Sequence, residues 1–251
     1  MIAYYEEDGI SIFQADCREV LPTLSDVDLI FTSPPYNKGL RVDGKWSGIV
    51  TESSKSHRFR AGYNGRSDMM DQGAYEELHR EILGLCWQTL SPGGAIFYNH
   101  KPRIVNGRLW TPLILNPGLP LRQIVTWDTG AGINIMPGAY VPAYQWIMIF
   151  AGSSFRLRSR EDSALSDVWH VRPVHSREHP APFPVDLVER AIRTTAPRTL
   201  LDPFMGTGAA LIAAKRAGIR AIGIEREREY CDVAIQRLEH ECATDIIEEI
   251  A

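Results

Sequence analysis

Short apolar runs recur along the chain and alternate with stretches in which apolar residues follow helical spacing. Apolar runs bounded by turn residues are typical of buried strands, whereas apolar positions spaced by about one helical turn indicate helices. The pattern predicts strands over 9–16, 27–32, 95–99, 122–127, 145–150, 199–201 and 221–224. It predicts helices over 74–90, 103–115, 185–195, 209–217 and 230–241. Strands that alternate with helices imply an α/β fold with a mostly parallel sheet covered on both faces.

Two long segments interrupt this alternation. Residues 38–72 are polar, glycine-rich and basic, and residues 152–182 are loop-like and carry several arginines. Loops of such length inside a compact domain are usually functional. With 251 residues, we expect a single domain over 1–251 in which 38–72 and 129–178 are insertions.

Charge is distributed unevenly, although the net charge is only −4. Between residues 38 and 66 there are seven Lys or Arg residues and two acids, an excess of five positive charges. From residue 225 to the end there are nine acids and three Arg residues, an excess of six negative charges. A basic middle segment suits a polyanion such as nucleic acid, although two solvated faces would give the same pattern.

Several protein classes are disfavoured by what the sequence lacks. No apolar run approaches the ~18 residues of a membrane helix, and the acidic start, MIAYYEEDGI, is unlike a signal peptide. The four cysteines form no C-x-x-C pair, so we expect reduced thiols and a cytoplasmic protein without membrane association. His170, His175 and His179 are too few and too widely spaced for a metal site, and the zinc-deaminase signature is absent.

A glycine-rich turn joins a predicted strand and helix near the C-terminus. In TLLDPFMGTGAALIAAKRAGIRAIGIE the strand ends at Leu201, Gly206 and Gly208 allow a tight turn, and a second strand ends at Glu225. Glycines let the backbone approach a ligand closely, and an acid at the next strand tip typically binds ribose hydroxyls. The segment predicts a nucleoside site. The alternative is an ordinary tight turn, because only part of the longer glycine fingerprint is present.

A second motif follows the strand near the N-terminus, where VDLIFT leads into Ser33-Pro34-Pro35-Tyr36-Asn37. The two prolines fix the backbone and remove two N–H donors, which leaves carbonyl oxygens, the Ser33 hydroxyl and the Tyr36 ring. Oxygens accept hydrogen bonds from a planar amino group, and an aromatic ring stacks on the heterocycle that carries it. The alternative interpretation is a rigid strand exit with Tyr36 in the core.

Together the two motifs resemble those of the S-adenosylmethionine-dependent DNA amino-methyltransferases, which modify adenine N6 or cytosine N4. S-P-P-Y-N precedes D-P-F-x-G-x-G, which is the circularly permuted order of the β group of that family. Further matches in family order are FQADCREVLPTL (13–24), LSPGGAIFYNH (90–100), HPAPFPVDLVERAI (179–192) and GIEREREYCDVAIQRL (223–238). The resemblance covers nearly the whole chain. It implies a Rossmann-like methyltransferase fold with a doubly wound sheet, S-adenosylmethionine as cofactor and double-stranded DNA as substrate.

The resemblance also implies roles for individual residues. The expected catalytic residues are Ser33, Pro34, Pro35 and Tyr36. The expected cofactor site comprises Asp16, Cys17, Ser33, His179, Phe183, Asp202, Pro203, Phe204, Gly206, Thr207, Gly208, Glu225 and Arg226. With the charge pattern it suggests DNA contacts from Asn37, Lys38, Arg41, Lys55, Arg58, Arg60, Arg66, Arg156, Arg158, Arg160 and Arg172. No metal ligand is expected.

The choice of base rests on the residue before Pro34-Pro35. In this family a serine there is commoner among cytosine-N4 enzymes and an aspartate among adenine-N6 enzymes. Since Ser33 holds that place, we expect site-specific methylation of cytosine N4 on a flipped base, with adenine N6 as the alternative. A DNA-binding module with a vestigial cofactor site is a more distant alternative. A cognate restriction endonuclease and a homodimer are the expected partners.

Overall fold

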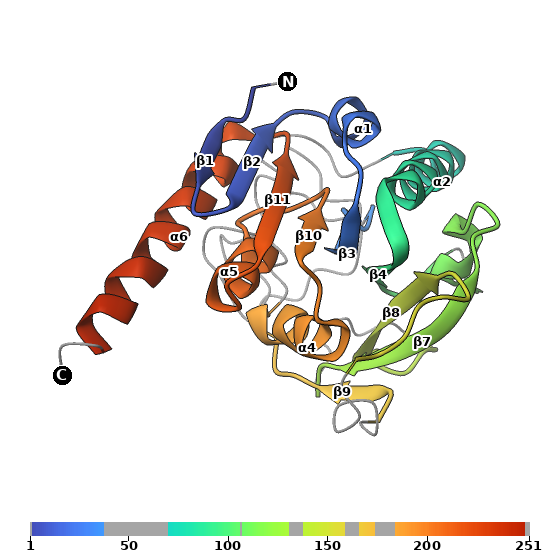
Figure 1. Cartoon of the computed structure of the whole chain (residues 1–251). Helices are drawn as coiled ribbons and strands as arrows, with labels where there is room; N and C mark the ends of the chain where they lie inside the picture. The colour runs from blue at the N-terminus through green and yellow to red at the C-terminus, as the bar shows by residue number, and fades with distance from the viewer. Residues whose placement is uncertain are drawn as a thin grey trace.

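A nine-stranded sheet with helices on both faces forms the body of the computed structural model (Figure 1). The structure describes residues 2–37, 70–105, 107–130, 138–158, 166–173 and 184–248, with side chains described up to residue 241. The strands are β1 (Tyr5–Glu7), β2 (Ile10–Gln14), β3 (Val27–Thr32), β4 (Leu90–His100), β5 (Arg103–Val105), β6 (Arg108–Trp110), β7 (Leu121–Asp128), β8 (Tyr144–Ala151), β9 (Val168–His170), β10 (Thr199–Asp202) and β11 (Arg220–Glu225). The helices are α1 (Cys17–Val20), α2 (Gln72–Thr89), α4 (Val185–Thr195), α5 (Ala209–Arg216) and α6 (Arg228–Glu248), with 3₁₀ turns η1 (Leu21–Thr23) and η4 (Pro112–Leu115).

The order of strands in the sheet is β1-β2-β11-β10-β3-β4-β8-β7-β9. β1 and β8 run antiparallel to their neighbours, and the other strands of this sheet share one direction. The predicted doubly wound, mostly parallel α/β fold is therefore confirmed. A strand from early in the chain, β3, lies beside a late one, β10, as the permuted order of the motifs implies.

The winding of the sheet reverses between β10 and β3. From β3 the chain passes through α2 to β4 on one side, and from β10 it passes through α5 to β11 on the other. In open α/β sheets, ligands bind at such a reversal, beyond the carboxyl ends of the strands. The tips of β3 and β10 are therefore the place where a functional site is expected.

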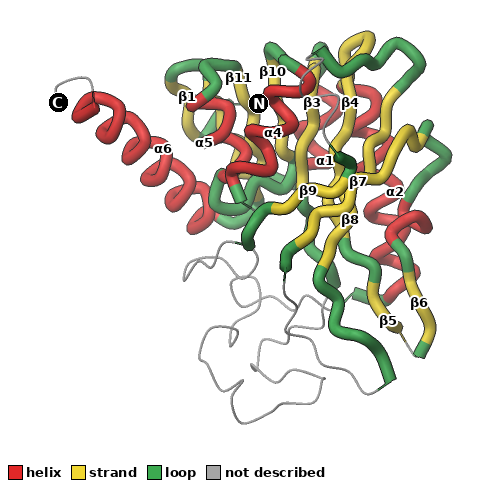
Figure 2. The backbone as a smooth tube through the Cα atoms, turned by 90° about the horizontal axis from the view of Figure 1, so that it is seen from below, coloured by secondary structure: helices red, strands yellow, loops and turns green. Residues whose placement is uncertain are grey.

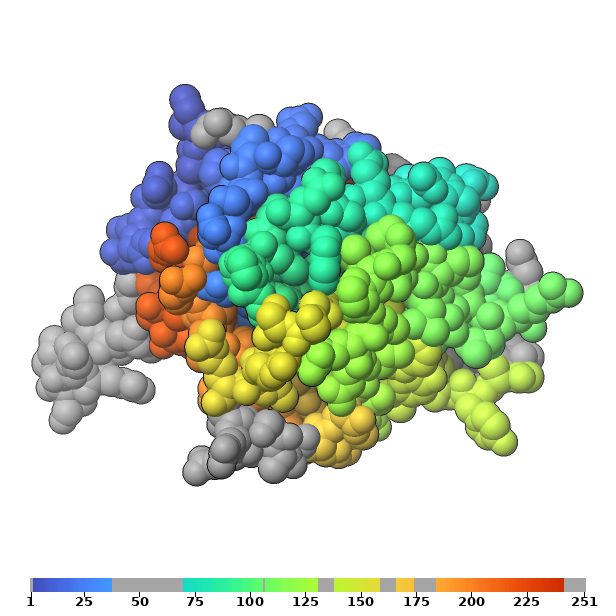
Figure 3. All heavy atoms as spheres, turned by 45° about the vertical axis from the view of Figure 1, so that its right-hand side comes forward, coloured from blue at the N-terminus to red at the C-terminus, as the bar shows by residue number. Residues whose placement is uncertain are grey.

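Two apolar layers cover the faces of the sheet. Because successive strand residues point to opposite faces, Leu29 and Phe31 of β3 pack toward α4, α5 and α6, while Ile30 packs toward α1 and α2. Phe97 and Tyr98 of β4 divide in the same way. α1 and α2 lie side by side on their face of the molecule (Figure 3). Close packing on both faces holds the central strand tips in place.

Local chemistry sets the helix boundaries. The Asp71 carboxylate caps α2 by accepting from the backbone N–H groups of Gly73 and Ala74, and Asp16 caps α1 by accepting from Arg18. Gly208, with φ of +80°, turns the chain from the segment after β10 into α5. The helix predicted over 185–195 is confirmed as α4. None of the described helices is long and apolar enough to cross a membrane.

Two segments differ from the prediction. The helix predicted over 103–115 is wrong, because β5 and β6 form a hairpin there in which Arg103 pairs with Trp110. Gly107, with φ of +73°, supplies the turn, and Pro112 opens the 3₁₀ turn η4. β9 lies within the predicted loop 152–182, where its three residues pair with β7. Figure 2 shows the β5–β6 hairpin beyond α2, at the opposite end of the molecule from α6.

Candidate active site

The two sequence motifs meet at the adjacent tips of β3 and β10. The Thr32 hydroxyl donates a hydrogen bond of 2.7 Å to Asp202 Oδ1, and both side chains are fully buried. The same Asp202 oxygen accepts from the Phe204 backbone N–H at 3.0 Å. Asp202 therefore joins the strand that carries the Ser-Pro-Pro-Tyr motif to the glycine-rich turn.

The second oxygen of Asp202 is buried and has no hydrogen-bond partner among the described residues. Burial raises the pKa of this carboxyl group to about 7, and the nearby Glu225 carboxylate acts in the same direction. A carboxyl group in this state offers an unused acceptor at the tip of β10.

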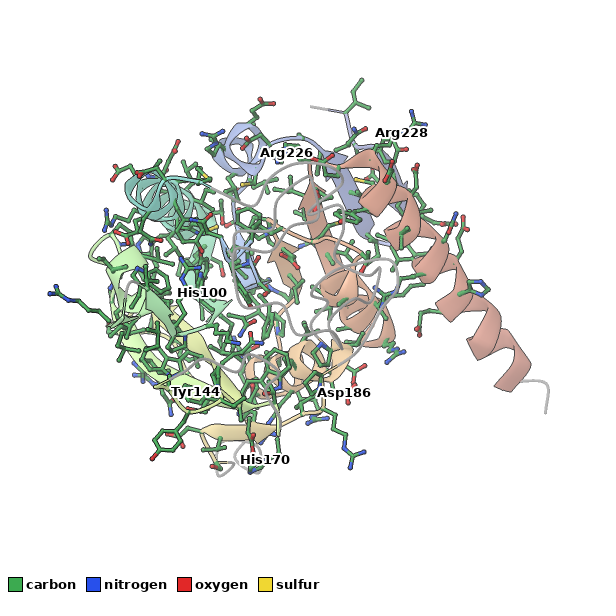
Figure 4. All side chains as sticks on the ribbon, turned by 180° about the vertical axis from the view of Figure 1, so that it is seen from behind. His100, Tyr144, His170, Asp186, Arg226 and Arg228 are labelled. Carbon is green, nitrogen blue, oxygen red and sulfur yellow. The ribbon has the colours of Figure 1, made fainter. Side chains whose placement is uncertain are left out.

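Glu225 ends β11 and lies against the glycine-rich turn. Its Oε2 accepts from the Gly206 backbone N–H at 3.1 Å, and its Oε1 accepts from the Glu227 backbone N–H at 2.8 Å. Burial raises the pKa of this half-buried carboxyl group, although these backbone hydrogen bonds oppose the shift. The Glu225 carbonyl accepts from the Ala15 N–H at 3.0 Å, which places Asp16 beside this strand tip. Arg226 follows and is exposed (Figure 4).

S-adenosylmethionine, the cofactor implied by the family resemblance, carries ribose hydroxyls, an ammonium group and a cationic sulfonium. Glu225 and Asp16 provide carboxylate acceptors at neighbouring strand tips, and Asp202 adds an unpartnered buried oxygen. An acceptor-rich, acidic set of this kind matches a cationic ligand with hydroxyl donors. The residues present fit the cofactor.

Other residues expected in the cofactor site serve the structure as well. The Thr207 side chain and carbonyl accept hydrogen bonds from Arg237 of α6, and a Cβ at Gly208 would lie 2.9 Å from Ala234 Cβ. The close approach of α6 therefore requires glycine at position 208. Pro203 and Cys17 are buried, and Phe204 stacks on His79. His179 and Phe183 lie outside the described residues.

Neighbouring side chains hold the backbone carbonyls that follow the first proline of the motif. The Tyr75 hydroxyl donates to the Pro35 carbonyl at 3.0 Å, and Arg103 donates to the carbonyls of Tyr36 and Asn37. Within the described part of the chain, no hydrogen bond reaches the carbonyl of the preceding proline, Pro34. That carbonyl and the half-buried Ser33 hydroxyl, whose oxygen keeps lone pairs beyond its contacts with Tyr36 and Asn99, are the candidate acceptors of the motif.

His100 supports this arrangement from the end of β4 (Figure 4). Its Nδ1 accepts from the Lys101 backbone N–H at 2.7 Å, so we assign the proton of the neutral ring to Nε2. Nε2 then donates to the Tyr75 hydroxyl at 2.6 Å, which leaves the Tyr75 proton for the Pro35 carbonyl. The motif is thus braced by a buried chain of directed hydrogen bonds.

Sequence reasoning missed two residues that contact the motif. Asn99 Oδ1 lies 2.6 Å from the Tyr36 hydroxyl and 3.1 Å from Ser33 Oγ, and Gln145 Oε1 lies 3.0 Å from the Tyr36 hydroxyl. Ser33 Oγ and Tyr36 Oη are themselves 2.6 Å apart. Asn99 lies in the segment LSPGGAIFYNH, whose family match was the available signal, whereas nothing local marks Gln145.

Tyr36 differs from the open stacking platform that the sequence suggested. It is only 6% exposed, and its ring packs against His100 with centroids 4.8 Å apart. Burial raises the pKa of its hydroxyl far above the ordinary value, so the phenol is neutral. The hydroxyl, rather than an exposed ring face, is what links Tyr36 to Ser33 in this structure.

The structure does not bring all of the predicted DNA-binding arginines to this site. β8 runs antiparallel to β4, so its carboxyl end lies at the opposite ends of the strands from Ser33. Arg156 and Arg158 follow β8 and therefore lie on that opposite side. The Arg158 N–H donates to the Thr194 carbonyl at the end of α4, which fixes that position. The reversal of β8 was not predicted, and it moves both arginines away from the motif.

Two other predicted DNA-binding residues lie at the same ends of the strands as the motif, one beside it and one at the far edge strand of the sheet. Asn37 directly follows the motif, and its side chain exchanges hydrogen bonds with the backbone of Met70. Arg172 is exposed and follows β9, which runs parallel to β7 and ends at the same edge of the sheet. The remaining candidates lie outside the described residues: Lys38, Arg41, Lys55, Arg58, Arg60, Arg66 and Arg160.

A cavity of about 240 Å³ lies at the opposite edge, lined by residues that include Phe97, Arg122, Phe155, Trp169 and Arg190. The Arg122 guanidinium lies 5.8 Å from the centre of the Phe155 ring, and that of Arg190 lies 5.0 Å from the Trp169 ring. Cation–π contacts of this kind stabilise packing. The cavity is remote from both motifs and is not assigned to the cofactor.

Comparison with known proteins agrees with this geometry. Residues 27–236 match the model of the N6 and N4 methyltransferase family described as DNA methylase. The chain is similar to Type II methyltransferase M.ScaI of Streptomyces caespitosus, with 26% identity over 95% of this chain and 84% of the relative. It is similar to Type II methyltransferase M2.DpnII of Streptococcus pneumoniae, with 26% identity over 96% of this chain and 94% of the relative.

Two solved structures share the fold. The PvuII DNA methyltransferase, which is cytosine-N4-specific, has a TM-score of 0.70 at 16% identity and covers 93% of this chain and 87% of its own. The complex of M1.HpyAVI with SAM has a TM-score of 0.58 at 19% identity and covers 91% of this chain and 100% of its own. At these identities the likeness concerns the fold alone.

Proposed function

Because this chain belongs to the DNA methylase family of N6 and N4 methyltransferases, we propose that it methylates the exocyclic amino group of cytosine at N4. Membership of the family makes it an S-adenosylmethionine-dependent DNA methyltransferase, whichever base it modifies. Ser33 supports cytosine, since a serine before the two prolines is commoner among the cytosine-N4 enzymes of the family. Adenine N6 is the second candidate, because its amino group offers the same pair of N–H donors.

The observation that carries this proposal is the pair of acceptors left open at the tip of β3. Ser33 Oγ and the Pro34 carbonyl belong to adjacent residues, and the carbonyls of Pro35, Tyr36 and Asn37 are already held by Tyr75 and Arg103. An exocyclic amino group presents two N–H bonds to such a pair. The fitting cofactor residues lie at the adjacent tips of β10 and β11, so amine and methyl donor meet across the reversal of the sheet.

The acceptors address the chemical difficulty of the reaction. The lone pair of an aromatic amine is conjugated into its ring and attacks poorly until the nitrogen pyramidalises. Ser33 Oγ and the Pro34 carbonyl would hold the N–H bonds and aim the lone pair across the site. S-adenosylmethionine, when bound, supplies an electrophilic methyl group. The N–H protons become acidic once the amine is methylated, so solvent can take one without a strong base.

Cysteine-based methylation of a ring carbon finds no support at this site. The Cys17 thiol is buried near the cofactor residues, and burial raises its pKa to about 12. The thiolate is the nucleophilic form, and this thiol is protonated at neutral pH. Within the described residues, Cys86 and Cys231 are also buried with raised pKa values.

The proposed substrate is double-stranded DNA with the target nucleotide flipped out, because the amine of a paired base cannot reach the cofactor. We assign phosphate contacts to Asn37, Arg172 and the basic residues of segment 38–66, which would set the register on the duplex. The Type II methyltransferase relatives favour a site-specific enzyme with a cognate restriction endonuclease. A single catalytic domain and a homodimer complete the proposal.

Analysis of the methylated base tests the proposal directly. Plasmid DNA incubated with the protein and S-adenosylmethionine should yield N4-methylcytosine when it is hydrolysed and its nucleosides are weighed by mass spectrometry. The acceptor pair predicts methylation of an amine rather than of a ring carbon, and Ser33 favours the amine of cytosine over that of adenine. N6-methyladenine would establish the second candidate, and a methyl group on cytosine C5 would contradict the mechanism.

Replacing Glu225 with alanine should weaken S-adenosylmethionine binding by about 10- to 100-fold, because a charge-assisted hydrogen bond to ribose is lost. The Gly206 N–H also loses its acceptor, which loosens the turn. Calorimetric titration measures the change. Glu229→Ala, an exposed acid at the start of α6, is the matched control and should bind as wild type. Unchanged affinity in Glu225→Ala would remove this residue from the cofactor site.

A further inference from the structure

The hydrogen bonds that link Ser33, Tyr36 and Asn99 have a direction that is set by the acceptor at their end. The chain of contacts runs from Ser33 Oγ through Tyr36 Oη to Asn99 Oδ1, with 2.6 Å at each step. Asn99 is fully buried and Tyr36 is nearly so. Each hydroxyl owns a single proton, whereas an amide oxygen owns none, so the end of the chain determines which way the protons point.

The amide of Asn99 is oriented by the backbone of β8. Its Nδ2 donates to the Trp146 carbonyl at 3.1 Å, and a carbonyl oxygen can only accept. Rotating the amide would bring two acceptors together at that position, so Oδ1 must face Tyr36 and Ser33. Asn99 therefore presents a pure acceptor to the network.

The proton positions follow from this acceptor. The contact of 2.6 Å between Tyr36 Oη and Asn99 Oδ1 requires the Tyr36 proton. With that proton committed, the Ser33 proton is left for Tyr36 Oη at 2.6 Å or for Asn99 Oδ1 at 3.1 Å, both of which lie inside the protein. The Ser33 hydroxyl thus points its proton into the protein and its lone pairs toward the site.

We propose that Asn99 is a positioning residue that, through the Tyr36 hydroxyl, keeps Ser33 as a hydrogen-bond acceptor for the target amine. This inference rests on the proposed function. It assigns the orientation of the Ser33 hydroxyl to Asn99 and to the Tyr36 hydroxyl, because the ring of Tyr36 cannot provide it. Without the network, the Ser33 hydroxyl could rotate and present its proton to the amine, where it would compete with the required geometry.

Gln145 completes the surroundings of the phenol. Its side-chain carbonyl lies 3.0 Å from Tyr36 Oη, which has already given its proton to Asn99. The oxygen and nitrogen of an amide are exchangeable by rotation, so this contact becomes a hydrogen bond if the amide turns its nitrogen toward Tyr36. In that orientation Gln145 would donate to Tyr36 Oη and leave the Tyr36 proton to Asn99.

A double-mutant cycle on the full chain tests the proposal. Asn99→Ala and Tyr36→Phe should each lower kcat by about 10-fold, with the KM for DNA and the affinity for S-adenosylmethionine unchanged. In the Ser33→Ala background neither substitution should lower kcat further, because both act through the Ser33 hydroxyl. Tyr36→Phe keeps the ring volume, so it carries the test where Asn99→Ala fails to fold.

The control is Asn116→Ala, whose side chain makes three hydrogen bonds in the turn after η4, far from the motif. It should lower the melting temperature without lowering kcat. Equal losses of kcat in the wild-type and Ser33→Ala backgrounds would overturn the role of Asn99, as would full activity of Asn99→Ala and Tyr36→Phe. Failure of the proposed function is a separate result, since it appears as a wild-type product other than an amine-methylated base.

Discussion

Replacing Ser33 with alanine should lower kcat by about 100-fold, while the affinity for S-adenosylmethionine stays at the wild-type value. The hydroxyl accepts an N–H bond that strengthens as the amine pyramidalises, so its loss is felt in the transition state more than in binding. Single-turnover kinetics on duplex DNA measures the rate, and calorimetry measures the cofactor affinity. The methylated base should be the same as for wild type, because the Pro34 carbonyl remains.

Ser91→Ala is the matched control for this experiment. Ser91 is a half-buried serine at the start of β4, where its hydroxyl donates to Asp28 Oδ1 at 2.7 Å, at the opposite edge of the sheet. It should keep the wild-type kcat. A Ser33→Ala protein with a wild-type rate would show that the serine hydroxyl is not an acceptor in the reaction. A loss of cofactor affinity would move Ser33 from the amine side of the site to the cofactor side.

Removing the charge of Asp202 should change how the stability of the cofactor-free protein depends on pH. The pKa of this carboxyl group is about 7 in the folded protein. Its ordinary value is 3.8, so between pH 4 and pH 7 the folded protein keeps a proton that the unfolded chain has lost. Stability from this group is therefore present at low pH and lost as pH rises toward 7, by about 4 kcal/mol in total.

Asp202→Asn removes that dependence. The melting temperature of the variant, measured relative to wild type, should rise by roughly 10 °C between pH 5 and pH 8. Glu225 contributes in the same direction and His79, whose pKa is lowered to about 3 by burial, contributes in the opposite one. Both are present in the two proteins and largely cancel in the difference. Asp186→Asn, at an exposed aspartate of α4, should leave the difference near zero.

A difference between the two proteins that stays constant from pH 5 to pH 8 would show that Asp202 is ionised throughout. The group would then be stabilised by partners beyond Thr32 and Phe204. The outcome also bears on the cofactor, because a carboxyl group that gives up its proton near neutral pH gains from a cationic ligand. Addition of S-adenosylmethionine should therefore stabilise the wild-type protein more at pH 8 than at pH 5.

The sequence alone predicted the parts of the molecule that depend on local pattern. The segment VDLIFT becomes β3 with the predicted bounds, and α4 likewise matches its prediction. The hairpin of β5 and β6 was mistaken for a helix, because two three-residue strands are too short to show alternation. The turn at Gly107 and the pairing across it decided in favour of the hairpin over the helix.

The residues of the active site likewise divide into those that the local sequence reveals and those that only strand pairing brings to the site. The two motifs, their permuted order and the family were readable from the sequence, because each motif is a contiguous run whose residues share one strand tip. Asn99 and Gln145 were not, since they lie 66 and 109 residues from their partners Ser33 and Tyr36. Only the register of β4 and β8 brings them to the motif, and a shift of one residue would turn them to the other face.

The sequence by itself thus determined which chemical groups the protein brings to a methyl transfer and in what order they occur along the chain. The tertiary structure decided how those groups are arranged: that Ser33 Oγ contacts the Tyr36 hydroxyl, that the Tyr36 ring is covered, and that Arg156 lies away from the site. The physical reason is that hydrogen-bond direction and strand direction are set by partners distant in sequence, whereas motifs are set by neighbours along the backbone.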